Sequence, residues 1–303
     1  MKLKLFFASL ICSFSMAFAE EGMLIPSLIE AFESDMKARG MKLTAEQIYS
    51  VNNSSIKDAV IHFNGGCTAE IVSAKALLLT NHHCGFYNIQ SHSSLENDYL
   101  KNGFWAMDMK DELPNPGLYA TRIVKIVDVT DAVNNAKSPA DYETIKKAEI
   151  DGTHYIAQIK AFDFGNKYYM MVSEKFLDVR LVGAPPSAIG KFGGDTDNWV
   201  WPRHTGDFSV FRIYADKNNN PSTFSEDNVP YKPKHFLPIN IESKHKGDFA
   251  MIYGFPGRTE QHVTRQMLEH VMKEDRPKRI AMREKTLDII GAAMKSSDLL
   301  RIK

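Results

Sequence analysis

A histidine pair followed by a cysteine is the feature of this sequence that most clearly suggests chemistry. Residues 79–85 read Leu-Thr-Asn-His-His-Cys-Gly and come directly after a short apolar run. An imidazole held at the end of a strand, with its ring facing a cleft, is suited to act as a general base. We take His83 as the candidate base and His82 as the structural member of the pair.

Two other interpretations of this motif stay open from the sequence alone. A His-His-Cys cluster could bind zinc, although adjacent histidines rarely point at one ion. Alternatively, both histidines could be structural and satisfy local polar groups. The zinc interpretation requires Cys84 to be a free thiol, because a disulfide-bonded sulfur cannot ligate the metal as a thiolate.

A second cluster of polar and aromatic residues lies at 195–208, just before an apolar run at 208–214. Binding groups are often placed on such loops. Asp207 occupies the end of the cluster, where a carboxylate can be buried against an imidazole. There it would orient the ring and stabilise its cationic form. The alternative is an aspartate that caps a turn.

The first nineteen residues have the character of a secretory signal. Lys2 and Lys4 precede a largely apolar run at 5–18, and Ala-Phe-Ala at 17–19 provides a small-x-small cleavage site. The apolar run is shorter than the roughly 20 residues that a membrane span requires. We therefore expect an exported protein, in the periplasm or at the cell surface.

Cleavage after this segment would remove Cys12 and leave Cys67 and Cys84. An even pair of cysteines in an exported chain predicts a disulfide. A bridge between Cys67 and Cys84 would close a loop of about seventeen residues. In the chain-entropy model, closing a loop of that length stabilises the fold by about 3 kcal/mol. Two buried free thiols are the alternative.

These residues must be positioned by a mainly β fold. Short apolar runs between turn residues predict strands at 59–63, 69–72, 76–79, 119–127, 155–162, 168–182, 208–214 and 249–253. Helices are predicted at 26–50 and 138–150, and a helical region at 259–303. Strands and helices do not alternate regularly, which favours an antiparallel barrel or sandwich with inserted helices over a doubly wound sheet.

The balanced charge gives no support for a nucleic-acid partner. The chain has 37 basic and 37 acidic residues, so no global field attracts it to nucleic acid. A nucleic-acid partner is therefore not expected.

Seven segments together resemble the bacterial serine dipeptidyl-peptidase family that includes dipeptidyl-peptidases 7 and 11. The segments are 67–71 (CTAEI), 78–85 (LLTNHHCG), 90–94 (QSHSS), 103–107 (GFWAM), 112–117 (ELPNPG), 198–207 and 254–259 (GFPGRT). They occur in order, and the resemblance as a whole runs from about residue 21 to the end without large gaps. His83 immediately before Cys84 also resembles the trypsin-family arrangement, in which the base histidine precedes a disulfide-bonded cysteine.

The resemblance implies a chymotrypsin-like double β-barrel with a large α-helical domain inserted between its halves. Residues 20–257 would then form the N-terminal part of the peptidase domain, an incomplete double barrel, and 258–303 the truncated start of the helical domain. A peptide with a free N-terminus would be the substrate and the partner. No metal or organic cofactor is implied, and a homodimer of the full-length protein is a further expectation.

By motif position, His83 matches the catalytic base of that family and Asp207 the residue that orients it. Asn198 and Trp199 match the residues that hold the α-amino group of the substrate. This assignment is chemically reasonable, because an amide oxygen accepts a hydrogen bond from an ammonium group and an indole face attracts a cation. Capturing the amino terminus at a fixed distance from the nucleophile would release dipeptides.

The sequence departs from the family in its serines. The family order is His, Asp, Ser, with the serine in a Gly-rich turn. This sequence has no Gly-x-Ser-Gly, and no serine after Asp207 has flanking glycines that could build an oxyanion hole. We therefore expect the N-terminal portion of a serine dipeptidyl-peptidase that is inactive alone. The alternative is a complete non-catalytic protein that binds peptide N-termini.

Overall fold

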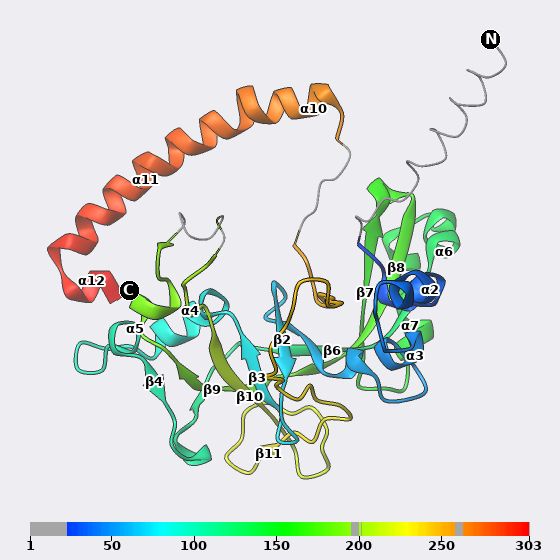
Figure 1. The fold of residues 1–303 in the computed structure, drawn as a ribbon, viewed down its shortest axis with the longest axis horizontal. Helices are drawn as coiled ribbons and strands as arrows, with labels where there is room; N and C mark the ends of the chain where they lie inside the picture. The colour runs from blue at the N-terminus through cyan, green and yellow to red at the C-terminus, as the bar shows by residue number, and fades with distance from the viewer. Residues whose placement is uncertain (1–22, 195–199, 201, 258–262, 303) are drawn as a thin grey trace.

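The computed structural model describes residues 23–194, 200, 202–257 and 263–302. Within them, eleven strands form one antiparallel sheet in the order β4-β9-β10-β3-β2-β1-β6-β8-β7, with β11 paired to β10 and β5 to β9 (Figure 1). The strands are β1 (Val60–Phe63), β2 (Cys67–Ile71), β3 (Leu77–Thr80), β4 (Phe104–Trp105), β5 (Leu113–Pro114), β6 (Ala120–Asp128), β7 (Ile156–Phe162), β8 (Lys167–Phe176), β9 (Asp178–Ala184), β10 (Ser209–Ala215) and β11 (Val229–Pro230).

The sheet curves back on itself. β8 and β9 stand far apart in the strand order, yet only Leu177 separates them along the chain. A shift of register in β6 between Ile123 and Lys125 helps this curvature, because a bulge bends the strand that carries it. The main hydrophobic core lies inside the curve and is built from β1, β2, β3, β9 and β10, together with Phe176.

The helices lie at the periphery of the sheet. They are α2 (Glu33–Ala38), α3 (Ala45–Ile48), α4 (His82–Ser91), α5 (Tyr99–Asn102), α6 (Thr130–Asn135), α7 (Pro139–Ile150), α8 (Ser187–Gly190), α10 (Arg265–His270), α11 (Arg276–Ser296) and α12 (Asp298–Ile302). Short 3-10 helices lie at Pro26–Phe32, Ile56–Asp58, Met109–Asp111 and Asp163–Gly165, and a π-helical turn lies at Val271–Asp275. No described helix is both long and apolar enough to span a bilayer.

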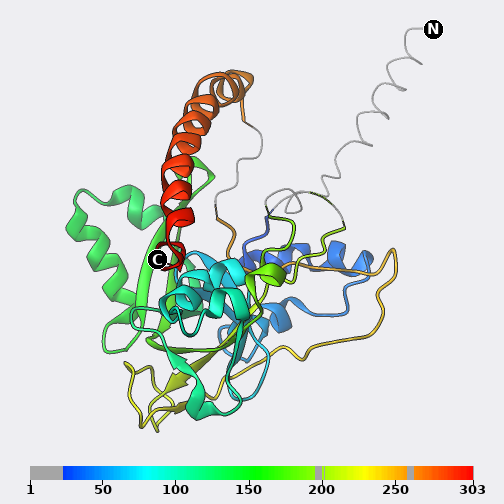
Figure 2. The same cartoon turned by 90° about the vertical axis from the view of Figure 1, so that its left-hand side faces the viewer.

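The last helices form an arm that returns to the site region. α10 and α11 pass along one side of the molecule, and α12 comes back beside α4 and α5 (Figures 1 and 2). Arg301 pairs with Asp98 at 2.5 Å, and the Gln90 amide donates to the Ile302 carbonyl at 2.6 Å. The end of α12 is therefore fixed to α4, the helix that contains His83.

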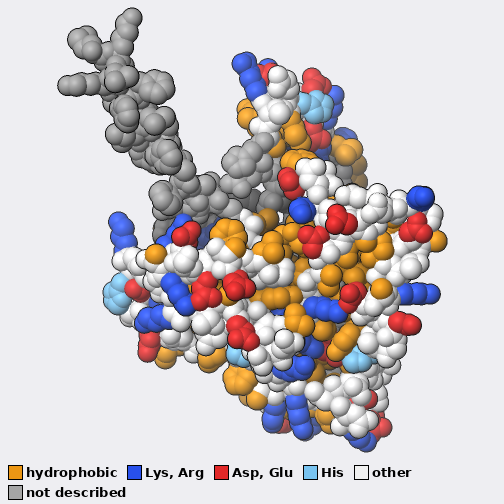
Figure 3. Space-filling model, turned by 90° about the vertical axis from the view of Figure 1, so that its right-hand side faces the viewer, with side chains coloured by type: hydrophobic (Ala, Val, Ile, Leu, Met, Phe, Trp, Pro, Cys, Tyr) orange, Lys and Arg blue, Asp and Glu red, His pale blue; other side chains and the backbone are white. Residues whose placement is uncertain are grey.

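Most of the predicted elements are present, and the antiparallel sheet with helices is confirmed. The surface agrees with the balanced composition, since acidic and basic side chains are interspersed on the face shown in Figure 3.

Three predictions were wrong in detail. The helix predicted at 26–50 is broken, because Gly40 ends it with a φ of +104°. The strand predicted at 168–182 is two strands.

The strand predicted at 249–253 is irregular backbone. Its apolar side chains serve a different purpose. Phe249 and Met251 pack against the small N-terminal core formed by Ile29, Met36, Met41, Ala45 and Ile48. Burial in that cluster explains the apolar run without any pairing to the sheet.

A buried ion network ties β6 to β8. The Arg122 guanidinium donates to Asp58 at 2.6 Å and to Glu174 at 2.8 and 3.2 Å, and Lys57 also donates to Asp58 at 2.8 Å. Arg122 is only 3% exposed. Removing one member of such a network leaves uncompensated charge in the interior.

We expect Arg122→Met to lower the free energy of unfolding by about 3–5 kcal/mol, because the buried Glu174 would lose its guanidinium partner and keep only the ring of His154. Urea denaturation measures this change. Lys167→Met is a matched control, since its pair with Asp128 is exposed and 3.7 Å long. Equal stabilities of the two variants would show that the network is not needed for folding.

Candidate active site

Two adjacent antiparallel strands bring the histidine motif to the aspartate. In the ladder of β3 and β10, Thr80 lies opposite Ser209. The chain leaves β3 just beyond Thr80 and enters β10 just before Ser209. His83 and Asp207 therefore meet at the same end of the strand pair.

His83 lies in the first turn of α4. Asn81 precedes this helix in an extended conformation, with φ −68° and ψ 151°. The first N–H groups of a helix have no partner within the helix. The Asp207 Oδ1 atom accepts one of them, the backbone N–H of His83, at 3.0 Å. A carboxylate at this position is also favoured by the helix dipole.

The same carboxylate orients the imidazole. Asp207 Oδ2 lies 2.7 Å from His83 Nδ1. The Asn81 amide donates to Oδ2 at 3.2 Å and to the Asp207 carbonyl at 3.1 Å. Since an ionised carboxylate only accepts hydrogen bonds, the neutral ring places its proton on Nδ1 and its lone pair on Nε2.

The ring is open to an approaching molecule. The His83 side chain is 69% exposed, whereas that of Asp207 is 24% exposed. Among the described residues, His83 Nε2 makes no hydrogen bond. The arrangement can therefore accept a proton at Nε2 while the carboxylate stabilises the resulting cation.

A disulfide joins Cys67 to Cys84, with Cα atoms 6.2 Å apart. This confirms the predicted pair. A ring nitrogen of His83 and the two sulfur atoms all lie within 4.8 Å of one another. Because both sulfurs are used in the bridge, the zinc interpretation loses its thiolate ligand. The bridge instead fixes the first turn of α4 to the start of β2.

Close packing holds the base of α4. The Ser209 hydroxyl donates to the Asn81 carbonyl at 2.8 Å. Gly85 lies so close to β10 that an added Cβ would come within 2.7 Å of the Ser209 oxygen. A larger residue at 85 would push the helix away from the strand and move His83 from Asp207.

His82 is structural, in line with the prediction from the sequence. Its side chain is buried, and its Nε2 has no hydrogen-bond partner among the described residues. It packs on Gly190, where a Cβ would lie 2.4 Å from the ring. Burial lowers the pKa of His82 below its ordinary value, so the ring is held neutral.

The loop before Asp207 is held by α8. The Thr205 hydroxyl donates to the carbonyls of Ile189 and Gly190, both at 3.2 Å, and the Gly206 N–H donates to Ile189 at 3.0 Å. α8 therefore contacts His82 on one side and anchors the Asp207 loop on the other. Its Gly190 is the point of closest approach.

Asn198 and Trp199, predicted to hold the substrate's amino group, lie outside the described residues.

A family model of known peptidases matches nearly the whole sequence. The model, described as Peptidase S46, covers residues 19–303. The chain belongs to the peptidase S46 family. Members of the family therefore provide the relevant comparisons for the His83 site.

Two curated S46 relatives show the extent of the similarity. The Asp/Glu-specific dipeptidyl-peptidase of Flavobacterium psychrophilum is 51% identical over 295 residues, which cover 93% of this chain and 41% of that protein. Dipeptidyl-peptidase 7 of Phocaeicola vulgatus is 46% identical over 323 residues, covering 100% of this chain and 45% of that protein.

The fold also matches a solved S46 structure. The crystal structure of Porphyromonas endodontalis DPP11 in complex with the dipeptide Arg-Glu has a TM-score of 0.87 and 46% identity to this chain. The match covers 93% of this chain and 43% of that one. The chain thus spans less than half the length of the S46 proteins it matches.

Sequence reasoning missed the supporting residues of the site. Asn81 lies inside the histidine motif without any chemistry assigned to it from the sequence, yet its amide and carbonyl both hold the site together. Its place between a strand and a helix, a position where Asn is a preferred cap, was the available signal. Ser209 gave no signal, because its role depends on the pairing of β10 with β3.

We expect replacing both bridge cysteines, Cys67→Ser with Cys84→Ser, to lower the free energy of unfolding by about 3 kcal/mol through the freed loop. Urea denaturation of the oxidised parent and the double variant measures the difference. Reducing agent should destabilise the parent and leave the double variant unchanged. A parent insensitive to reduction would contradict a stabilising bridge.

The buried His82 predicts a pH dependence of stability. Its pKa is lowered in the fold, so the unfolded chain binds a proton at higher pH than the native chain. The stability that it contributes is complete above about pH 6.5 and decreases as the pH falls below that value.

We expect His82→Gln to reduce the loss of stability between pH 7 and pH 5, measured as urea midpoints at each pH. His204→Gln replaces an exposed histidine and should keep the slope of the parent. Identical slopes for the parent and His82→Gln would contradict a buried neutral imidazole.

Proposed function

We propose that this chain supplies the base and the orienting carboxylate of a serine dipeptidyl-peptidase. The observation that carries this proposal is the contact of one carboxylate, Asp207, with both the backbone N–H and the ring Nδ1 of His83. The arrangement leaves the ring largely exposed, with the lone pair on Nε2, as general-base catalysis requires.

In the proposed reaction, His83 Nε2 removes the proton from a serine hydroxyl while its oxygen attacks the carbonyl of the second peptide bond. The tetrahedral intermediate then expels the amine of the departing peptide, which receives the proton from His83. Water, activated by the same imidazole, hydrolyses the acyl-enzyme and frees a dipeptide. Asp207 keeps the ring in place and stabilises the imidazolium during both the formation and the hydrolysis of the acyl-enzyme.

We place the nucleophilic serine outside this sequence, because no serine here has the Gly-rich setting that an oxyanion hole needs. Asn198 and Trp199 are proposed to hold the free α-amino group of the substrate. In support, the relatives are named as dipeptidyl-peptidases, and the similar DPP11 structure contains a dipeptide. No metal or organic cofactor enters this scheme.

We further propose that the curved sheet is the first half of a chymotrypsin-like double barrel. The single residue between β8 and β9 supports this proposal, since it brings distant parts of the strand order together. On this view residues 20–257 belong to the peptidase domain and 258–303 begin a helical domain.

We propose export to the periplasm or the cell surface. The signal-like character of residues 1–19 and the disulfide both support it, because disulfides persist in oxidising compartments. A homodimer of the whole protein remains a proposal that the family resemblance suggests.

The test uses the protein translated from the whole reading frame that contains this sequence. We expect His83→Ala and Asp207→Asn each to lower kcat for release of dipeptides by about 10⁴-fold, because the base or its orientation is lost. His92→Ala is the control, because His92 lies at the far end of α4 and its ring contacts Asn115 and not Asp207. Full activity in either site variant would overturn the proposed roles.

The 303-residue chain alone is expected to release no dipeptide from an oligopeptide, because it lacks the nucleophile. Mass spectrometry of the incubated peptide measures this. Turnover by the chain that survives in His83→Ala would refute the assignment. An inactive protein from the complete reading frame would instead favour the non-catalytic peptide-binding alternative.

A further inference from the structure

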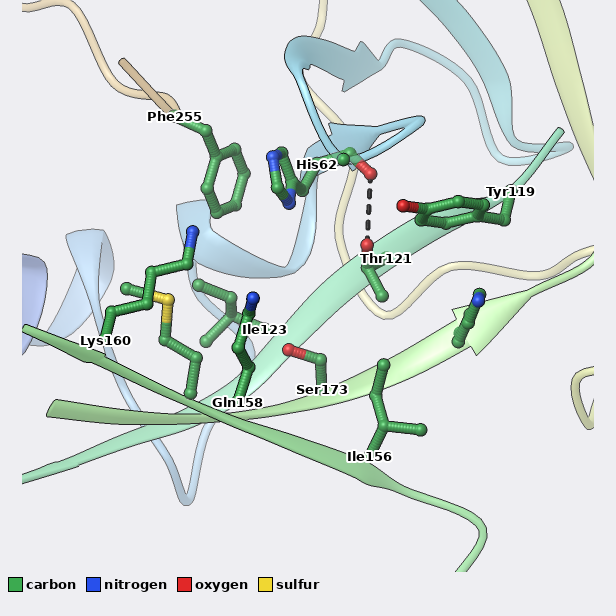
Figure 4. A pocket seen from close by; sticks show the side chains of 12 residues that line it. His62, Tyr119, Thr121, Ile123, Ile156, Gln158, Lys160, Ser173 and Phe255 are labelled. Atoms are coloured by element: carbon green, nitrogen blue, oxygen red, sulfur yellow. Dashed lines mark hydrogen bonds between the residues drawn. The ribbon is translucent and has the colours of Figure 1, made fainter. Parts of the chain in front are cut away.

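A half-open pocket lies on the outer face of the sheet, over β6, β7 and β8. Its cavity volume is about 290 Å³. Alternate residues of the three strands point into it, and His62 and Phe255 close one side, with their rings stacked at 4.6 Å (Figure 4). We call this the His62–Lys175 pocket.

The charged side chains lining this pocket are all basic. Lys160 and Lys175 are among its twelve lining residues, and none of the twelve is Asp or Glu. Lysines elsewhere on these strands have acidic partners. Lys125 pairs with Glu149 and Lys167 with Asp128, whereas Lys160 and Lys175 form no ion pair with any described residue.

The rest of the lining suits a peptide. Tyr119, Ile156 and Phe255 give apolar surface, and Ser173 and Gln158 offer polar groups at the centre (Figure 4). The Lys175 ammonium lies 4.0 Å from the centre of the Tyr119 ring, a cation–π contact that holds it at the edge of the pocket. An extended peptide with carboxylate side chains would match both the lysines and the mixed apolar and polar lining.

The pocket begins beside the His83 site. Gly65, one of its lining residues, lies two positions before Cys67, which is bonded to the residue after His83. The tight turn here needs Asn64 and Gly65 at positive φ. Phe255 is held at the same place, since its N–H donates to the Thr68 hydroxyl at 2.8 Å.

Lys175 lies farther from His83 than this edge of the pocket. It is aligned with Thr68 of β2 through Thr121 and His62, and β8 is three strands away from β2 in the sheet. With strands about 4.8 Å apart, Lys175 lies roughly 14 Å across the sheet from Thr68, the neighbour of Cys67. A peptide extends about 3.4 Å per residue, so about four residues would reach it. Lys160 lies on the other side of the pocket, beside Phe255 (Figure 4).

In a dipeptidyl-peptidase, only two residues precede the cleaved bond. They span about 7 Å and end at the site that holds the amino group. The part of a substrate that can extend as far as Lys175 is therefore the departing peptide.

We propose that the His62–Lys175 pocket binds acidic side chains of the departing peptide, about four residues beyond the cleaved bond. This inference rests on the proposed peptidase function for its direction along the substrate. The binding of acidic peptide itself depends only on the pocket.

The first experiment measures binding to the 303-residue chain carrying His83→Ala, so that catalysis plays no part. The probes are two amidated pentapeptides, Ala-Gly-Ala-Glu-Glu and Ala-Gly-Ala-Gln-Gln, followed by amide chemical shifts in NMR spectra. We expect the Glu peptide to bind about 3- to 10-fold more tightly, as two partly exposed ion pairs would give. Shifts should concentrate at Gly65, Ser173 and Lys175.

The double variant Lys160→Met with Lys175→Met should bind the two peptides equally. Lys167→Met removes a charge from the same strand outside the pocket and should keep the preference. The NMR spectra also report whether each variant is folded. A preference that survives in the folded double variant, or no difference between the peptides in the parent, would overturn the site.

The second experiment tests the role in the complete enzyme. Two matched octapeptides carry Glu or Gln at the fourth and fifth residues after the cleaved bond. We expect a lower KM for the Glu peptide at unchanged kcat, because remote binding stabilises the ground state and the transition state equally. The double lysine variant should remove the difference.

Equal KM values in an active parent would overturn the assignment to the departing peptide. Absence of any cleavage would instead refute the proposed function, and the binding experiment would still decide whether the pocket takes acidic peptide.

Discussion

The structure depends on one carboxylate placed at the start of one helix. Asp207 accepts the backbone N–H of His83 and faces the ring nitrogen of the same residue. The first contact fixes where the helix begins, and the second fixes how the ring is turned. Since one group makes both contacts, the position and the orientation of His83 cannot vary independently. The chemical result is a largely exposed ring with its lone pair on Nε2.

The surrounding fold keeps that carboxylate and that helix together. The pairing of β3 with β10 brings the two segments to one end of the sheet, and the Cys67–Cys84 bridge ties the helix to β2. On the other side, the buried His82 ring fills the space over α8, whose carbonyls hold the loop before Asp207. A rigid frame therefore supports a ring that is itself largely exposed, as a base that must meet a substrate requires.

The sequence predicted the elements with strong local signals. The strands around the histidine motif, the pairing of the cysteines and the structural role of His82 were all accessible from spacing and type. The break at Leu177 was not, because apolar residues continue through it and only the curvature of the sheet reveals the corner. The strand predicted at 249–253 was wrong for another reason. Its apolar residues pack on the N-terminal helical cluster and do not pair with the sheet. Contacts such as the Asn81 amide on Asp207 join segments more than a hundred residues apart, so no local pattern indicates them. The His62–Lys175 pocket likewise exists only once four strands are placed side by side.

The most direct measurement is the tautomer of His83, read from the ring ¹⁵N signals of the chain by NMR above the pKa of the ring. The account predicts a neutral ring with its proton on Nδ1, hydrogen-bonded to Asp207, and a bare Nε2. In Asp207→Asn this preference should be lost, because a side-chain amide can also donate to Nδ1. A proton on Nε2 in the parent, or a tautomer that does not change when Asp207 is replaced, would contradict the claim that this carboxylate makes His83 a base.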